Sequence, residues 1–258
     1  MSPSFSRLKP GLKTIKTIFR GGRVKIRNIY MLTCGMILTL ALSNSARGQE
    51  ISEHRRDAVR QTEKAAEVFR EFMNIREGDI PQTLLNKAMC VAVFPDVIKA
   101  GFIFGGRYGR GVASCRTKLG WSAPAFFNLG GGSFGLQLGA QATDFVFLFL
   151  GDKGIDSLLR SKFELGGDAS AAAGPLGRQA GASTDMFLRS RILTYSRSKG
   201  LFAGIELKGT VISQDDDDLL VTYGQETTTI SVLNGTIPAP YAVRIFPATL
   251  NSYSRRRL

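Results

Sequence analysis

Residues 134 to 140 read Phe134-Gly135-Leu136-Gln137-Leu138-Gly139-Ala140, so large apolar residues alternate with Gly or Gln. Successive side chains of a β-strand point to opposite faces, and this stretch therefore predicts a strand with one buried face and one face of small residues. The chain contains 29 glycines, and 18 of them lie between Gly101 and Gly181. This density is typical of a strongly curved sheet with bulges and tight turns.

Short apolar or alternating runs on both sides of this stretch predict further antiparallel strands. They are Met89 to Phe94, Gly101 to Phe104, Gly111 to Arg116, Trp121 to Asn128, Asp144 to Leu150, Ile192 to Ser198 and Leu201 to Val211. Gly154 to Ser161 predicts a short helix, Asp215 to Asp218 a turn or helix start, and Pro240 to Asn251 a final helix or irregular segment.

An amphipathic helix is predicted over residues 51 to 75, because Ala58, Ala65, Phe69 and Phe72 recur at helical spacing between charged residues. A second, short helix is expected from Pro81 to about Lys87. We see no internal repeat and no long linker beyond it. The expected fold class is α+β: a single β-rich domain with a curved, glycine-rich antiparallel sheet or barrel-like core, an N-terminal amphipathic helix and short accessory helices.

The charge of the chain is concentrated in its first 48 residues, which hold nine of the 34 Lys and Arg residues and no acid. An apolar run from Ile29 to Leu42 and then small residues follow, which is the layout of a secretory signal peptide. An uncleaved anchor and an organelle transit peptide stay as alternatives. The remainder has 25 basic and 21 acidic residues. This near balance argues against a nucleic-acid-binding surface.

We therefore divide the chain into a signal peptide at 1–48, an N-terminal helix at 49–80, a main domain at 81–250 and a basic tail at 251–258. After the leader only Cys90 and Cys115 remain as cysteines. They form either one disulfide in an oxidising compartment or two small buried apolar side chains. Neither lies in a metal-binding spacing, and we expect no metal and no cofactor.

The motif Gly131-Gly132-Ser133-Phe134-Gly135 matches a hydrolase nucleophile elbow by letter, and Gly130, Gly132 and Gly135 match a dinucleotide fingerprint. Both motifs need a helix directly after the glycines, whereas an alternating strand pattern follows. The single histidine, His54, lies far upstream in the predicted N-terminal helix. We find no catalytic constellation and expect no enzymatic activity.

Several short motifs follow one another in a characteristic order through the main domain. They include Val93-Phe94-Pro95, Lys99-Ala100-Gly101-Phe102, Trp121-Ser122-Ala123-Pro124-Ala125-Phe126, Gly135-Leu136-Gln137-Leu138-Gly139-Ala140-Gln141, Asp168-Ala169-Ser170, Ala172-Ala173-Gly174-Pro175, Thr194-Tyr195-Ser196-Arg197-Ser198, Gly200-Leu201-Phe202-Ala203-Gly204 and Tyr223-Gly224. In these motifs the chain from about Pro81 to Pro238 resembles the SYLF domain, in its exported bacterial type. Asp218 to Thr222 departs from the family pattern because it lacks an expected Asn-containing helix.

The resemblance implies a non-catalytic domain that binds anionic phospholipid headgroups at a membrane surface. The predicted signal peptide leads us to expect this domain in the periplasm or outside the cell. The candidate lipid-binding residues are Lys99, Arg107, Arg110, Lys153, Arg160, Lys162, Arg178, Arg197 and Lys199. The apolar stripe of the N-terminal helix suits either a membrane interface or packing on its own domain. The alternative function is a structural or envelope module that binds an unidentified protein.

Overall fold

The computed structural model describes residues 51–254 of the 258-residue chain, except for 75–79, 102–103, 135–138, 176–189, 199–200, 204–206 and 208. The chain divides into two units, residues 1–50 and 51–258, of which the second contains all the described residues. The predicted leader and Arg255 to Arg257 of the predicted tail therefore lie outside the described residues.

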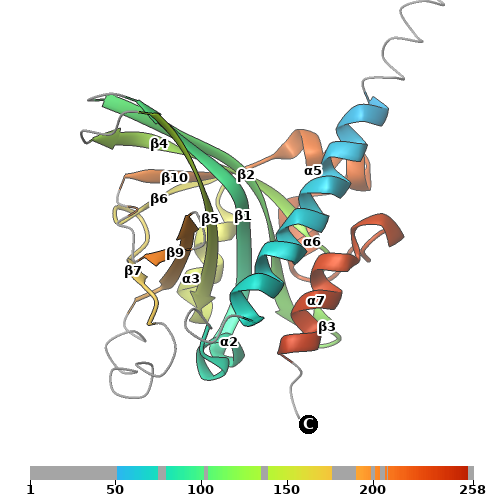
Figure 1. Ribbon diagram of the computed structural model, residues 1–258. Coiled ribbons are helices and arrows are strands. Elements are labelled where there is room, and N and C mark those ends of the chain that lie inside the picture. Colours follow the sequence, from blue (N-terminus) through green and yellow to red (C-terminus); the bar gives the residue numbers. More distant parts are fainter. Residues whose placement is uncertain are drawn as a thin grey trace, which may run out of the picture. The chain divides into compact units, whose positions relative to one another are not determined.

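A mixed sheet that curls into a half-barrel dominates the described part of the chain (Figure 1). Its strands are β1 (Ala88–Gly101), β2 (Phe104–Thr117), β3 (Gly120–Trp121), β4 (Ala125–Phe134), β5 (Gly139–Leu150), β6 (Lys162–Leu165), β7 (Ala171–Ala173), β8 (Ile192–Ser198), β9 (Leu201–Ala203) and β10 (Thr210–Gln214). The main order is β6-β10-β4-β2-β1-β5-β8-β7, with β3 beside β2 and β9 beside β8. The α+β class and the curved sheet are confirmed, although β7 pairs with β8 in parallel.

The described helices cover both faces of this sheet. They are the N-terminal helix (residues 51–74), α2 (Gln82–Lys87), α3 (Gly151–Leu159), α5 (Asp216–Tyr223), α6 (Thr229–Leu233), the 3₁₀ helix η2 (Tyr241–Val243) and α7 (Ile245–Tyr253). Asp215 caps α5 by accepting a hydrogen bond from the Asp218 amide, so the aspartate run is a helix start. None of these helices has both the length and the apolar character that a bilayer span requires.

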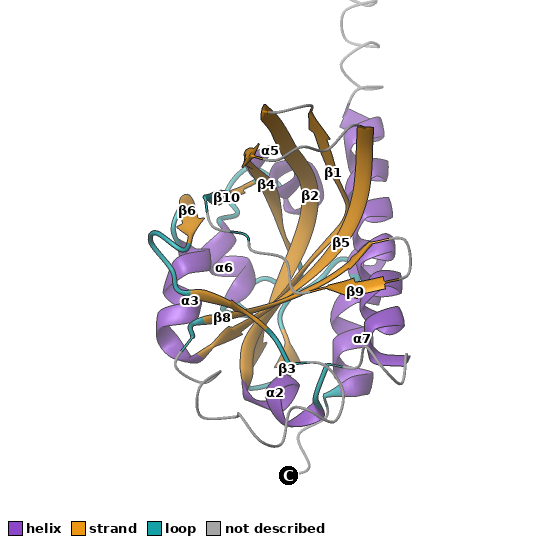
Figure 2. Cartoon of the chain, turned by 60° about the vertical axis from the view of Figure 1, so that its left-hand side comes forward, coloured by secondary structure: helices purple, strands orange, loops and turns teal. Residues whose placement is uncertain are grey.

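Two apolar clusters lie on opposite faces of the sheet, and β1 contributes to both by alternation. Val91 and Val93 belong to the outer face, which packs against the N-terminal helix and α7. Cys90, Ala92 and Phe94 belong to the inner face, which packs against α3 and α6. Figure 2 shows the N-terminal helix and α7 on one side of the sheet and α3 and α6 on the other.

The apolar stripe of the N-terminal helix is buried on the outer face of the sheet. Ala58, Ala65, Phe69 and Phe72 are each fully buried in the outer cluster. Of the two interpretations of this stripe, the structure shows packing on the domain itself. In this arrangement the helix does not present its apolar side to a bilayer.

A bulge at Pro95 and Asp96 bends β1 in the middle of the sheet. β1 uses one residue more than β2 between Val93 and Ile98, and Asp96 has a positive φ of 48°. On β2, Gly109 and Gly111 lie against this bend. A Cβ added at Gly111 would lie 2.4 Å from the Phe94 ring and 2.5 Å from the Val93 carbonyl oxygen. The curvature therefore requires the absence of a side chain at this position.

Four of the predicted strands contain parts of two strands in the structure. Trp121 belongs to β3 and Asn128 to β4, and residues 122–124 between them are not in a strand. Phe134 ends β4 and Gly139 begins β5, and β2 and β1 lie between these two strands, so residues 134 to 140 are not one strand. Residues 135–138 themselves lie outside the described residues. Gly101 and Phe104 likewise belong to two strands, β1 and β2, and Leu201 to Val211 contributes to both β9 and β10.

We predict that Gly111→Ala lowers the free energy of unfolding by about 1–3 kcal/mol, because the new methyl group overlaps Phe94 and the β1 backbone. Gly132→Ala is the matched control, since a Cβ there meets nothing within 4 Å. Urea denaturation followed by circular dichroism compares the two variants. Equal stability of both variants would show that the bend does not depend on Gly111.

Candidate functional site

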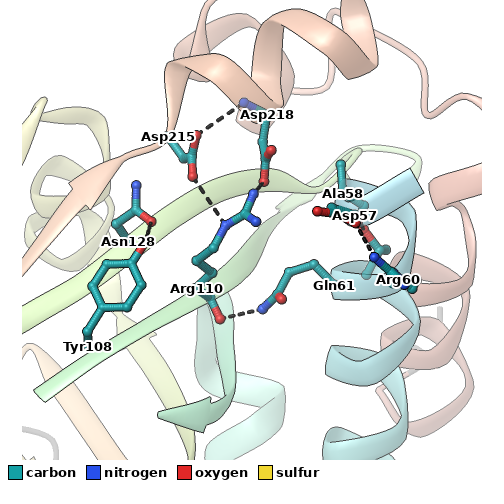
Figure 3. Close-up of polar contacts among 10 residues, drawn as sticks. Asp57, Ala58, Arg60, Gln61, Tyr108, Arg110, Asn128, Asp215 and Asp218 are labelled. Carbon is teal, nitrogen blue, oxygen red and sulfur yellow. Dashed lines mark hydrogen bonds and ion pairs between the residues drawn. The ribbon is translucent and has the colours of Figure 1, made fainter. Parts of the chain in front are cut away.

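Arg110 of β2 connects the sheet to both α5 and the N-terminal helix (Figure 3). Its guanidinium forms ion pairs with Asp218 and with Asp215, at 3.6 Å for the latter. Its carbonyl oxygen accepts a hydrogen bond from the side-chain amide of Gln61. Burial and the neighbouring Asp215 raise the pKa of Asp218, whereas Arg110 acts in the opposite direction. This predicted lipid-binding arginine is thus paired within the domain.

A second ion-pair network surrounds the β1 bulge. Arg197 of β8 lies 2.7 Å from Asp144 of β5 and also pairs with Glu71 of the N-terminal helix. The other Asp144 oxygen accepts the Asp96 amide at 2.9 Å. Lys64 of the N-terminal helix pairs with the Asp96 carboxylate at 2.9 Å. We refer to Asp96, Arg110, Asp144 and Arg197, which follow the apolar core on the outer face, as the polar belt.

Sequence reasoning did not single out Arg116, whose side chain connects α2, the start of β1 and the residue that follows α7. Its guanidinium donates to the carbonyl oxygens of Ala88 and Leu85 at the end of α2 and to that of Ser254 after α7. It also lies 4.5 Å from the centre of the Trp121 ring. The residues it contacts are up to 138 positions away, so no local sequence pattern could have indicated this role.

Lys99 and Arg107 form the second group of predicted site residues that the sheet brings together. They are directly opposite each other on β1 and β2, and alternation places both on the inner face. Arg107 donates to the Thr210 hydroxyl at 3.3 Å, and its buried Nε has no hydrogen-bond partner among the residues that the structure describes. Burial lowers the pKa of Arg107. Neither cation has a carboxylate partner among the described residues.

Of the remaining predicted site residues, Arg110 and Arg197 pair with carboxylates on the outer face, and the others do not all lie within the described ranges. Arg160 and Lys162 are exposed where α3 leads into β6. Lys153 lies in α3, while Arg178 and Lys199 lie outside the described residues. The headgroup contact of all nine residues stays a prediction, and the structure distinguishes Lys99 and Arg107 as the two that face each other.

The catalytic motifs considered above take ordinary structural positions. Ser133 lies within β4 opposite Gly105, and the described part of the glycine-rich motif, through Phe134, belongs to this strand. His54 lies in the N-terminal helix. Within the described ranges, no three His, Cys, Asp or Glu residues are grouped so that they could hold a metal ion.

Cys90 and Cys115 form a disulfide between β1 and β2, which decides between the two interpretations of these cysteines. The two residues are opposite each other in the strand register, and both are buried. The bond therefore lies on the inner face of the two central strands, at the opposite end of β2 from Arg107.

The fold and this site define a class of α+β domains with a half-barrel sheet, a helix packed on its outer face and two opposed cations on its inner face. A comparison with protein families matches residues 130–253 to Ysc84, described as a Las17-binding protein actin regulator. The chain belongs to this Ysc84 or SYLF family, as its sequence motifs indicated.

Relatives from several organisms share this domain. Protein YSC84 of Saccharomyces cerevisiae is 38% identical over 191 residues, which cover 70% of this chain and 41% of that protein. SH3 domain-containing YSC84-like protein 1 of Rattus norvegicus is 32% identical over 203 residues, covering 76% of this chain and 59% of the rat protein. The chain thus spans about half the length of the relatives it matches.

We predict that Asp144→Ala lowers the free energy of unfolding by about 3 kcal/mol, because it leaves the mostly buried Arg197 with one carboxylate instead of two and removes the acceptor for the Asp96 amide. Glu53→Ala is the control, since its ion pair with Arg56 is long and exposed. That control is expected to change stability by less than about 0.5 kcal/mol. Urea denaturation measures the free energy of unfolding of both variants. An Asp144→Ala variant as stable as the unaltered protein would contradict the role of the polar belt.

We also predict that the denatured, unreduced protein has no reactive thiol at Cys90 or Cys115. Reduction is expected to lower the free energy of unfolding by about 3 kcal/mol, since it releases a cross-link between residues 25 positions apart. Peptide mapping after maleimide labelling identifies the labelled cysteines, and thermal unfolding with and without reductant measures the stability. Labelling of both cysteines before reduction would contradict the assigned bond.

Proposed function

We propose that the protein binds anionic phospholipid headgroups through Lys99 and Arg107. The observation that supports this proposal is the contrast among the cations of the sheet. Arg110 and Arg197 each face carboxylates, whereas Lys99 and Arg107 face each other without one. Like charges directly opposite on neighbouring strands repel, so this arrangement costs stability in the absence of an anion.

A phosphate group between these residues would remove the repulsion. It would also provide an acceptor for the buried Arg107 Nε, which has no partner within the described part of the chain. Arginine and lysine donors differ in their geometry for phosphate, because arginine offers a planar fork and lysine a mobile point charge. Both kinds of donor bind phosphate, so a headgroup phosphate can accept hydrogen bonds from Arg107 and Lys99 together.

We further propose that the protein is exported and acts at the periplasmic or outer side of a membrane. Two independent features support this proposal. The first 48 residues have the layout of a signal peptide. The Cys90 and Cys115 disulfide is of a kind that persists in oxidising compartments. Mass spectrometry of the native protein is expected to give an N-terminus at Gln49, and a mass that includes residues 1–48 would contradict cleavage.

The headgroup proposal predicts that Lys99→Ser/Arg107→Ser weakens binding to vesicles of equal parts phosphatidylglycerol and phosphatidylcholine about 25-fold. This estimate takes about 1 kcal/mol for each cation near an anionic surface. The same variant is expected to be at least as stable as the unaltered protein, because the repulsion and the unpartnered Arg107 Nε disappear. Vesicle co-sedimentation and urea denaturation measure the two properties.

Lys87→Ser/Lys118→Ser is the matched control, since it removes the same charge from two exposed positions near the other end of the β1 and β2 pair. It is expected to bind vesicles nearly as the unaltered protein does. An equal loss of vesicle binding in both variants would show that net charge alone governs binding. A loss of stability in Lys99→Ser/Arg107→Ser would instead indicate a structural role for the pair.

A protein partner is the second candidate function. It is favoured by the names of relatives, since the family description mentions Las17 binding and one yeast relative is LAS seventeen-binding protein 3. Capture of a protein from detergent-extracted, lipid-depleted envelope material would support this candidate. Its dependence on Lys99 and Arg107 would show whether both functions use one surface.

A further inference from the structure

Beyond the polar belt, the outer face of the sheet carries an apolar surface that no described residue covers. Ile98 and Tyr108 are directly opposite each other on β1 and β2, and 54% and 58% of their surfaces are exposed. Exposed small residues surround them on the same face: Ala100, Gly106, Gly132 and Ala142. We refer to these six residues as the tip surface.

The six tip-surface residues carry no charge, and the Tyr108 hydroxyl donates a hydrogen bond to the side-chain oxygen of Asn128 at 3.2 Å. The solvent side of a sheet is normally more polar than this. Nearer the core, the same face carries the charged side chains of the polar belt and the N-terminal helix. Figure 1 shows the ends of β1, β2, β4 and β5 extending away from the N-terminal helix and α7. The tip surface is thus separated from the outer core by charges and is not an extension of a buried interface.

The backbone at the tip surface is satisfied by the sheet itself. β1 is paired on both sides through Ile98, with Tyr108 on β2 and Ala142 on β5. β2 is likewise paired with β4 through Tyr108 and Gly130. Central strands can therefore approach an apolar environment without exposing unpaired amide or carbonyl groups.

The positions of Lys99 and Arg107 indicate which kind of partner the tip surface can contact. Each is the chain neighbour of a tip-surface residue and lies on the opposite, inner face of the same strand. A partner that meets this end of the sheet must therefore accept apolar groups and uncompensated cations together. An anionic bilayer offers acyl chains beside phosphates, and tyrosine is a preferred side chain at the level of the headgroups.

We propose that the tip surface enters the headgroup region of an anionic bilayer while Lys99 and Arg107 contact lipid phosphates. This inference rests on the headgroup binding proposed above and adds the orientation in which the domain meets the membrane. The N-terminal helix stays packed on the sheet in this orientation. The ends of β1, β2, β4 and β5, and not the apolar stripe of that helix, form the contact.

The first test measures depth of insertion with a tryptophan at the tip. Tyr108→Trp is expected to be quenched by phospholipids with brominated acyl chains in phosphatidylglycerol and phosphatidylcholine vesicles. The single native tryptophan, Trp121, is an internal control because it is only 8% exposed and its indole N–H is bonded to Ser254. The unaltered protein should therefore show little quenching.

The second test removes the apolar groups. Ile98→Ser/Tyr108→Ser is expected to weaken co-sedimentation with the same vesicles about tenfold while the far-ultraviolet circular dichroism stays unchanged. Leu119→Ser is the matched control, because Leu119 is 99% exposed in the turn that follows the opposite end of β2. It is expected to leave vesicle binding unchanged.

The outcomes separate this inference from the function on which it rests. If the protein sediments with vesicles but the tryptophan at position 108 is not quenched, the tip orientation is wrong and headgroup binding stands. If the unaltered protein does not sediment with anionic vesicles, both proposals fail. If sedimentation velocity shows a dimer that Ile98→Ser/Tyr108→Ser dissociates, the tip surface is a contact between two copies, and the membrane assignment is overturned.

Discussion

Strand β1 crosses the middle of the sheet and bends where Pro95 and Asp96 form a bulge. Pro95 has no amide hydrogen to donate, and a proline inside a central strand is tolerated only at such an irregularity. The bend presses Phe94 and Val97 toward β2, where only Gly109 and Gly111 leave room. On the outer side, the same bulge turns the Asp96 amide toward Asp144, which also holds Arg197. The bulge thus accounts for the bend of β1, for the two glycines of β2 that lie against it, and for the contact of Asp96 with Asp144 in the polar belt.

The polar belt divides the outer face into two parts with different roles. On one side of it, Phe69 and Phe72 of the N-terminal helix are buried on the sheet. On the other side, Ile98 and Tyr108 are exposed. An exposed ion pair at Lys64 and a partly buried one at Glu71 link the helix to the sheet, but they contribute little net energy by themselves. The belt therefore fixes where the covered core ends and where an uncovered end of the sheet begins.

Much of the fold could be predicted from local patterns in the sequence. The N-terminal helix and β8 have clear periodicity, and their boundaries match closely. The alternation from Phe134 to Ala140 was misleading, because it continues from the end of β4 to the start of β5 and so hides the change of strand. Helix α5 includes the residues Asp218 to Thr222, where the sequence departs from the family pattern. Helix α6 was not predicted from the sequence. Gly109 and Gly111 of β2 resemble strand breakers in the sequence, whereas in the structure they make room for Val97 and Phe94 of β1.

The site could be predicted only as a set of cations, because strand register is not visible in the sequence. Nothing local distinguishes Arg107 from Arg110, although one faces Lys99 and the other faces two aspartates more than 100 residues away. Among the candidates that the structure describes, the register places two cations without a carboxylate, Lys99 and Arg107, opposite each other, and the proposed headgroup site depends on this pair. Lysine acylation footprinting of the purified protein tests it most directly. We predict that anionic vesicles protect Lys99 but leave Lys118 reactive, whereas equal modification of Lys99 with and without bound vesicles would contradict the account.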